Sequence, residues 1–403
     1  MTPTRLLKAT TIVLFAAVWA VGAVLLWRTT IPSGLHVASV DASHYVSDRA
    51  IDRAEHFQHV LRLLWIFGTL TQLAVLVVLA LLGRRIAAGF DLGKVGTGVL
   101  VGTFATLCLW ITGLPFGFLS LWWERRYNLS EQGYADWLLE QWPSLLGQVV
   151  GLTILLTFLM LLGGWLRRSW WLVAGPILVG VGALIVYVVS FAMTIGMHPI
   201  RDRTVAQDVR RLAHKEGVEG TKVRVQKISD QTHAINAMAV GPAQVSAVIV
   251  WDTVFDGRLK RREIDVIVAH EFGHIARKDI WRGIGWSALF TLPLLFLLSE
   301  ATRRRGGIDR PEVVPFALLV LAVLSLVALP VQNAISRRIE TEADWFALKT
   351  TRDPAAARGL FAKFTTADLA EPNPPLWDYV MLEDHPTIAQ RIAFANAWEK
   401  YGG

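Results

Sequence analysis

Cysteine and charged residues are both scarce in this 403-residue chain. The single cysteine, Cys108, excludes a disulfide within the chain and a metal cluster built from cysteine thiolates. Only 18% of the residues are Asp, Glu, Lys or Arg, whereas soluble domains contain roughly 25%. Since 53% of the residues are hydrophobic, the composition is that of a membrane protein rather than a set of soluble domains.

The formal net charge of +7 is by itself compatible with a nucleic-acid-binding protein. The arginines, however, stand in short pairs at the ends of apolar runs and are not clustered with aromatic residues. Such pairs are typical of the flanks of membrane helices. We therefore expect the lipid bilayer as a partner and no nucleic acid.

Seven apolar runs read as helices able to cross about 30 Å of hydrocarbon. They comprise residues 9–27, 61–83, 96–123, 145–166, 170–193, 284–299 and 313–331. The first run lacks a small-residue cleavage site, which favours an uncleaved membrane helix over a signal peptide. The sixth run is short and contains Pro293, so it is either re-entrant or extended by residues 280–283; we favour a spanning helix.

These runs divide the chain into four parts. Residues 1–196 form an N-terminal membrane domain with five spans, and residues 284–331 contribute two further spans. The stretches 197–283 and 332–403 are polar, lie on the same side of the bilayer and are expected to form one domain. The predicted elements of its first part are helices at 204–216 and 262–278 and strands at 222–228 and 245–251.

The fold class is therefore an α-helical multi-pass membrane protein with about seven spans and a small α+β domain. The side of the membrane on which this domain lies stays open, because basic residues flank the spans on both sides. The short segments 1–8, 84–95, 167–169 and 300–312 are basic and favour an outward-facing domain. Arginines on the side of the domain favour the opposite orientation.

The run His270-Glu271-Phe272-Gly273-His274 falls in the second predicted helix of the polar domain. Histidines four residues apart lie on one helical face, within reach of a single ion, and zinc suits two neutral imidazoles. Glu271 is then placed to take a proton from zinc-bound water and deliver it to the leaving amine. The alternative, two packed histidines, would leave polar groups unpaired in apolar surroundings.

A catalytic zinc ion takes three protein ligands and leaves the fourth position to water, so a further donor is needed. Residues 333–344 read as a helix with Glu340 and Asp344 on one face. We expect Glu340 to be the third ligand and Asp344 to accept the free ring N–H of a zinc-bound histidine. Glu342 is expected at the surface. For this segment alone, a solvated acidic face is the alternative.

These residues resemble the integral-membrane zinc metalloproteases of the type I CAAX prenyl protease and HtpX kind. In that family a glutamate opening a Glu-x-x-Ala-Asp run completes the zinc site, and Glu340, Ala343 and Asp344 match that run. The resemblance implies a gluzincin-type protease domain with one zinc ion per chain. Further matching patches are Leu114-Pro115-Phe116, Glu124 with Tyr127-Asn128, His233-Ala234-Ile235-Asn236-Ala237 and Ile249-Val250-Trp251-Asp252-Thr253.

The resemblance also implies roles for three more residues. Sites of this type bind the substrate backbone along a strand edge, where Asn236 is expected to hydrogen-bond the peptide; a turn-forming asparagine is the alternative. His385, in a His-Pro pair, is expected to donate to the developing oxyanion, with a capping or surface histidine as the alternative. Arg391 is expected to pair with substrate or with an acidic neighbour.

The expected function is that of a membrane-embedded zinc endopeptidase of the cell membrane, acting on hydrophobic, membrane-associated or lipidated peptides and proteins. A transporter or receptor with a structural zinc site is the alternative. Such a site would be closed by a fourth protein ligand, for which His385 is a candidate, and would have no use for Glu271. The oligomeric state, the physiological substrate and the cleavage position are not specified by the sequence.

Overall fold

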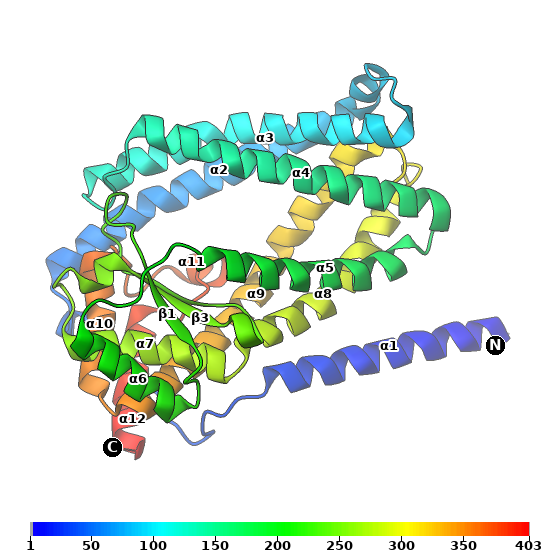
Figure 1. Ribbon diagram of the computed structural model, residues 1–403. Helices are drawn as coiled ribbons and strands as arrows, with labels where there is room; N and C mark the ends of the chain where they lie inside the picture. The colour runs from blue at the N-terminus through cyan, green and yellow to red at the C-terminus, as the bar shows by residue number, and fades with distance from the viewer. Residues whose placement is uncertain (1–2, 403) are drawn as a thin grey trace.

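Long helices make up most of the molecule, and a small sheet lies at one end of it (Figure 1). The computed structural model describes residues 3–402, with side chains described for residues 15–401. Six of its helices are long and apolar enough to cross a membrane. They are α2 (Asp48–Ala88), α3 (Gly93–Arg126), α4 (Tyr134–Leu166), α5 (Trp170–Met193), α8 (Asp279–Arg303) and α9 (Val314–Thr351).

The helix α1 (Pro3–Trp27) corresponds to the first predicted span. The side chains of α1 are described from Phe15 onward, and the described part, Phe15–Trp27, is apolar. It packs on α8, where the indole N–H of Trp19 donates to the carbonyl of Leu289 at 2.9 Å. The prediction of a multi-pass membrane protein with about seven spans is confirmed.

The sixth predicted span is a continuous helix, α8, that begins at Asp279 and runs through Pro293. The extended alternative is therefore correct, because the helix includes residues 280–283. At 1.5 Å per residue, its 25 residues reach roughly 38 Å, enough to cross the hydrocarbon layer.

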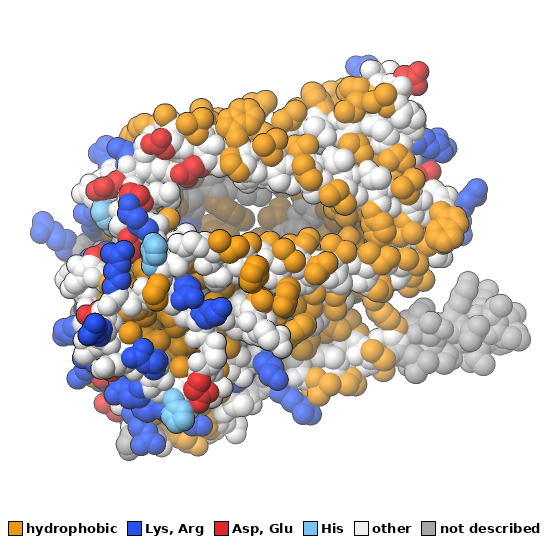
Figure 2. All heavy atoms as spheres, viewed as in Figure 1, with side chains coloured by type: hydrophobic (Ala, Val, Ile, Leu, Met, Phe, Trp, Pro, Cys, Tyr) orange, Lys and Arg blue, Asp and Glu red, His pale blue; other side chains and the backbone are white. Residues whose placement is uncertain are grey.

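Hydrophobic side chains cover the long helices, whereas charged side chains gather mainly over the end that carries the sheet (Figure 2). Leu81, Ile154 and Val327 are 75%, 66% and 69% exposed, respectively. Apolar surface on this scale requires a lipid environment.

The polar domain comprises the three-stranded sheet, the C-terminal part of α9 and the helices around them. In the sheet, the central strand β3 pairs in parallel with β1 and antiparallel with β2. The elements are α6 (Arg203–Glu216), β1 (Lys222–Gln226), β2 (Ala237–Val240), β3 (Ala247–Trp251), α7 (Arg261–Ala276), α10 (Pro354–Ala367), α11 (Leu376–Met381) and α12 (Ile388–Gly402). Short 3-10 turns are η1 (Ala42–His44), η2 (Ala243–Val245), η3 (Asp252–Phe255) and η4 (Pro311–Val313).

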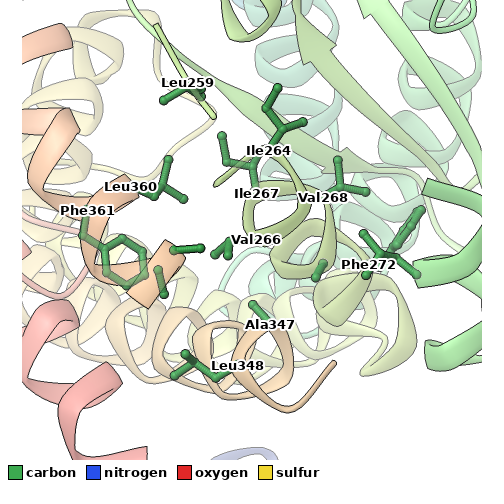
Figure 3. Close-up of a cluster of buried hydrophobic side chains, with 14 of the residues drawn as sticks. Leu259, Ile264, Val266, Ile267, Val268, Phe272, Ala347, Leu348, Leu360 and Phe361 are labelled. Carbon is green, nitrogen blue, oxygen red and sulfur yellow. The ribbon is translucent and has the colours of Figure 1, made fainter. Parts of the chain in front are cut away.

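Both polar stretches of the chain contribute to a single hydrophobic core (Figure 3). Val268 and Phe272 of α7 pack in one buried cluster with Leu348 of α9 and with Leu360 and Phe361 of α10. The two stretches are therefore held together by burial of apolar side chains.

The helix α9 is continuous from its membrane-spanning part into the polar domain. The boundaries drawn at 283 and 331 fall within α8 and α9, because hydropathy changes along these helices while the backbone stays helical. Glu340 is thus carried on the same rigid helix that crosses the membrane.

Candidate metal centre

Two helices cross closely at the centre of the polar domain. A Cβ atom added at Gly273 of α7 would lie 3.0 Å from Cβ of Phe346 and 3.5 Å from Cα of Ala343, both on α9. This approach brings Glu340 of α9 to the histidine face of α7.

Three potential ligand atoms converge at this crossing. Nε2 of His270 lies 3.2 Å from Nε2 of His274 and 3.1 Å from Oε2 of Glu340. The second carboxylate oxygen, Oε1, lies 3.5 Å from Nε2 of His274. One donor atom of each residue lies within 4.8 Å of the others, a spacing that fits a single metal ion.

A carboxylate holds the far end of each ring. Nδ1 of His270 lies 2.9 Å from Oδ1 of Asp344, and Nδ1 of His274 lies 3.0 Å from Oδ2 of Asp279. With its proton on Nδ1, each ring directs the lone pair of Nε2 toward the other ring and toward Glu340. Three acceptors that face one another need a proton or a metal ion between them, and two imidazole nitrogens with one carboxylate are a donor set that fits a metal.

The electrostatics of His270 lead to the same conclusion. Burial lowers its pKa, but the hydrogen bonds to Asp344 and Glu340 outweigh burial and raise the pKa to about 10. The carboxylates around the ring therefore stabilise positive charge at the position where a metal ion would bind.

Asp279 was missed by the sequence reasoning. It follows His274 by five residues and stands in the first turn of α8, after Lys278 has adopted a left-handed conformation with φ of 58°. This break between α7 and α8 turns the Asp279 carboxylate back toward the preceding helix. The signal available in the sequence was an aspartate close behind the second histidine.

Glu271 borders a cavity of about 100 Å³ beside the metal site. Asn236, Ala237, His385 and Arg391 also line it. In the described sheet, β2 pairs with β3 on one side only, and Ala237 is its first residue. The cavity therefore joins the edge of a strand to the proposed proton acceptor.

His385 lies over the third donor. Its Nε2 is 3.2 Å from Oε2 of Glu340, its Nδ1 is 2.7 Å from Oδ1 of Asp384, and its side chain is 49% exposed. Partial burial lowers the pKa of His385, but the hydrogen bonds to both carboxylates raise it to about 10. The ring is accordingly a charged N–H donor at the rim of the site.

Arg391 contacts the acidic neighbour, one of the two partners expected for it. It donates from Nε and Nη2 to the carboxylate of Asp344 at 2.9 and 2.6 Å, and its guanidinium lies 4.2 Å from the ring centre of Phe361. The side chain of Asn236 is exposed, and its backbone carbonyl accepts a hydrogen bond from the backbone N–H of Trp251 at 3.0 Å. Both residues border the cavity described above.

The expectation for Glu342 was wrong. This residue is completely buried and forms ion pairs with Arg277 and Arg282. The reason is that α9 is enclosed by α7 on one side and by α8 on another, so the face opposite the metal is also covered.

Comparisons with known proteins show which family and which relatives this chain is similar to. A family model described as peptidase family M48 matches residues 199–399. The relative named "Uncharacterized metalloprotease YhfN", from Bacillus subtilis, is 23% identical over 397 residues, covering 92% of this chain and 91% of the relative. A "Protease HtpX homolog" from Acidiphilium cryptum is 29% identical over 281 residues, covering 62% of this chain and 95% of the relative.

A solved structure supports the fold over nearly the whole chain. The crystal structure of Ste24p from S. mikatae superposes with a TM-score of 0.75 at 18% identity, covering 98% of this chain and 99% of that one. At this identity the similarity shows the fold alone.

Proposed function

The chain belongs to the integral-membrane metalloproteases of peptidase family M48, and we propose that it is a zinc-dependent endopeptidase for membrane-associated, hydrophobic or lipidated peptides and proteins. The observation that supports zinc most directly is the convergence of two imidazole Nε2 atoms and one carboxylate. Zinc prefers nitrogen donors with a carboxylate in a three-ligand catalytic site.

The donor count favours catalysis over a structural role. Among the described residues, the group whose ligand atoms all converge comprises His270, His274 and Glu340. A three-ligand set leaves one coordination position for water. His385 is not a member of this group, although it contacts Glu340.

In this proposal, different residues of the chain have different roles in peptide hydrolysis. Zinc, when bound, supplies an activated water and polarises the scissile carbonyl. Glu271 accepts the proton of that water and transfers it to the leaving amine. His385 donates to the oxyanion, and the edge of β2 with Asn236 binds the substrate backbone. Asp344, held by Arg391, fixes the ring of His270.

The position of the site supports the proposed class of substrate. Glu340 lies on a helix that also crosses the membrane, and His274 is five residues from the start of another such helix. The bilayer therefore concentrates hydrophobic or lipid-anchored chains near the site.

The first test compares the wild type with Glu271→Gln in detergent. We expect both proteins to hold about one zinc ion per chain, while cleavage of an unstructured peptide panel falls by about 10²–10⁴-fold in the variant. Glu340→Ala should lose zinc. A wild type that retains zinc but cleaves nothing more than Glu271→Gln does would contradict the proposal.

The substrate class needs a separate measurement in proteoliposomes. One peptide is compared with and without a lipid anchor, and the anchored form should show the higher kcat/KM. Equal values for the two forms would contradict the preference for membrane-associated substrates and leave the peptidase assignment intact.

A further inference from the structure

We propose that Asp279 and Arg282 are positioning residues that couple the docking of α1 to the orientation of the metal ligand His274. The proposal rests on the metal site described above. It goes beyond that site because it assigns the N-terminal helix, whose sequence contains no His, Cys, Asp or Glu, an influence on metal binding.

The first link runs from the ligand to Asp279. Nδ1 of His274 lies 3.0 Å from Oδ2 of Asp279, a residue that is only 8% exposed. Asp279 stands in the first turn of α8, where the helix dipole stabilises a carboxylate. A carboxylate in this position fixes the tautomer and the plane of the ring, and loss of such a contact typically weakens metal binding about 10–100-fold.

The second link is the guanidinium of Arg282, which joins three helices. Its Nη1 donates to Oδ1 of Asp279 at 2.8 Å and to Oε2 of Glu342 on α9 at 2.7 Å. Its Nη2 donates to the carbonyl of Leu26 on α1 at 3.1 Å. The rigid planar group therefore fixes the position of Asp279 relative to both α9 and α1.

Glu342 makes this arrangement difficult to rearrange locally. The side chain is fully buried, and Arg277 and Arg282 are its ion-pair partners. Removal of one partner from a buried ion pair leaves a poorly compensated charge and is strongly destabilising. The arginines consequently stay with Glu342, and the contact that can change is the one to α1.

Two further arginine contacts hold the C-terminal end of α1 and the segment that follows it. Nε of Arg338 donates to the carbonyl of Trp27 at 2.8 Å, and its guanidinium lies 4.5 Å from a ring centre of that residue. Nη1 of Arg277 donates to Oγ1 of Thr30 at 3.0 Å. Carbonyls in the last turn of a helix lack intrahelical partners and attract cations.

Displacement of α1 would release the Leu26 carbonyl from Arg282. The guanidinium would then shift toward its carboxylate partners, and Asp279 and the His274 ring would shift with it. Because coupling between two sites is reciprocal, metal binding should in turn tighten the docking of α1.

The first arm of the test measures zinc affinity of the full-length protein in detergent by competition with a chelator. Asp279→Asn keeps the shape but removes the charge, and we expect zinc affinity to fall about 10–100-fold. The matched control is Asp265→Asn, since Asp265 of α7 pairs with Arg211 instead; its affinity should equal that of the wild type. An unchanged affinity in Asp279→Asn would overturn the proposal.

The second arm measures hydrogen exchange of the peptide covering residues 23–32 with and without zinc. Exchange in the wild type should slow on zinc binding. Arg282→Lys retains the positive charge but lacks the planar guanidinium that reaches all three partners. In this variant the difference in exchange between the zinc-bound and zinc-free protein should disappear. A wild type that binds zinc and cleaves peptides without this slowing would overturn the coupling alone. A wild type that binds no zinc would overturn the proposed function as well.

Discussion

At the scale of single residues, each histidine of the pair is held at both ends of its ring. The sequence indicated His270, Glu271 and His274 because their spacing is local, and it indicated Glu340 and Asp344 because they share a helical face. Asp279 could not be found in this way, since its contact depends on the chain reversal at Lys278. Burial of Glu342 depends on which helices cover α9, and local spacing carries no information about that packing.

His385 provides a test at this scale. We expect His385→Asn to lower kcat by about 10²–10³-fold, because a donor to the oxyanion is lost, while zinc content stays unchanged. Peptide cleavage and zinc content are measured on the same preparation.

His214→Asn is the control, since His214 pairs with Glu219 at 2.8 Å at an exposed position and should behave as wild type. Loss of zinc from His385→Asn would instead identify His385 as a fourth ligand and support the structural-site alternative.

At the scale of elements, the helices and strands predicted for the first polar stretch match α6, β1, β3 and α7 to within a few residues. Their apolar residues recur with clear helical or strand periods. β2 was missed because four residues, Ala237–Val240, are too short for a period to be recognised. The continuity of α9 was missed because apolar composition ends near residue 331 while helix formation continues to Thr351.

The crossing of α7 and α9 predicts a strong effect of a small substitution. In Gly273→Val the new Cβ would lie only 3.0 Å from Cβ of Phe346, so α7 and α9 must shift apart by a few tenths of an ångström. We expect a loss of about 1–3 kcal/mol in unfolding free energy from overpacking, together with weaker zinc binding, because the ligands lie on both helices.

Gly283→Val is the matched control. Gly283 lies in α8, and a Cβ added there meets no atom within 4 Å. This variant adds the same β-branched residue to a helix and should retain the zinc affinity of the wild type. Chelator competition measures the zinc affinity, and thermal unfolding measures the stability. Equal zinc affinity in the two variants would show that the close crossing of α7 and α9 does not determine the geometry of the metal site.

At the scale of the whole molecule, a polar domain is folded onto the ends of helices that lie in lipid (Figure 2). Hydropathy predicted this division because spanning length and charge content are properties of composition. Composition does not determine how tightly the two regions are joined. The arginines that connect α1, α8 and α9 depend on tertiary contacts between residues far apart in the chain.

The polar domain also contains several carboxyl groups whose protonation should influence the stability of the entire protein. Burial raises the pKa of Asp368 to about 7, that of Glu383 to about 7 and that of Glu216 to about 8. In an unfolded chain these groups lose their protons near pH 4. Between pH 5 and 8 the folded state therefore binds more protons than the unfolded state, and the unfolding free energy falls as the pH rises.

Thermal unfolding of the metal-free protein at pH 5, 6.5 and 8 should accordingly show a falling midpoint. Metal must be removed because zinc binding releases protons and so has the opposite pH dependence. In the wild type, the N–H of Ile235 donates to Oδ1 of Asp368 at 2.8 Å. Asp368→Asn keeps an oxygen that can accept this hydrogen bond but removes the titrating carboxyl, so the midpoint should fall less steeply with pH. Each carboxyl contributes at most about 1.4 kcal/mol per pH unit, because the folded and unfolded states differ by no more than one proton at that group. A midpoint that does not change with pH would mean that water reaches the carboxyls in the folded state and that the polar domain packs less tightly around them.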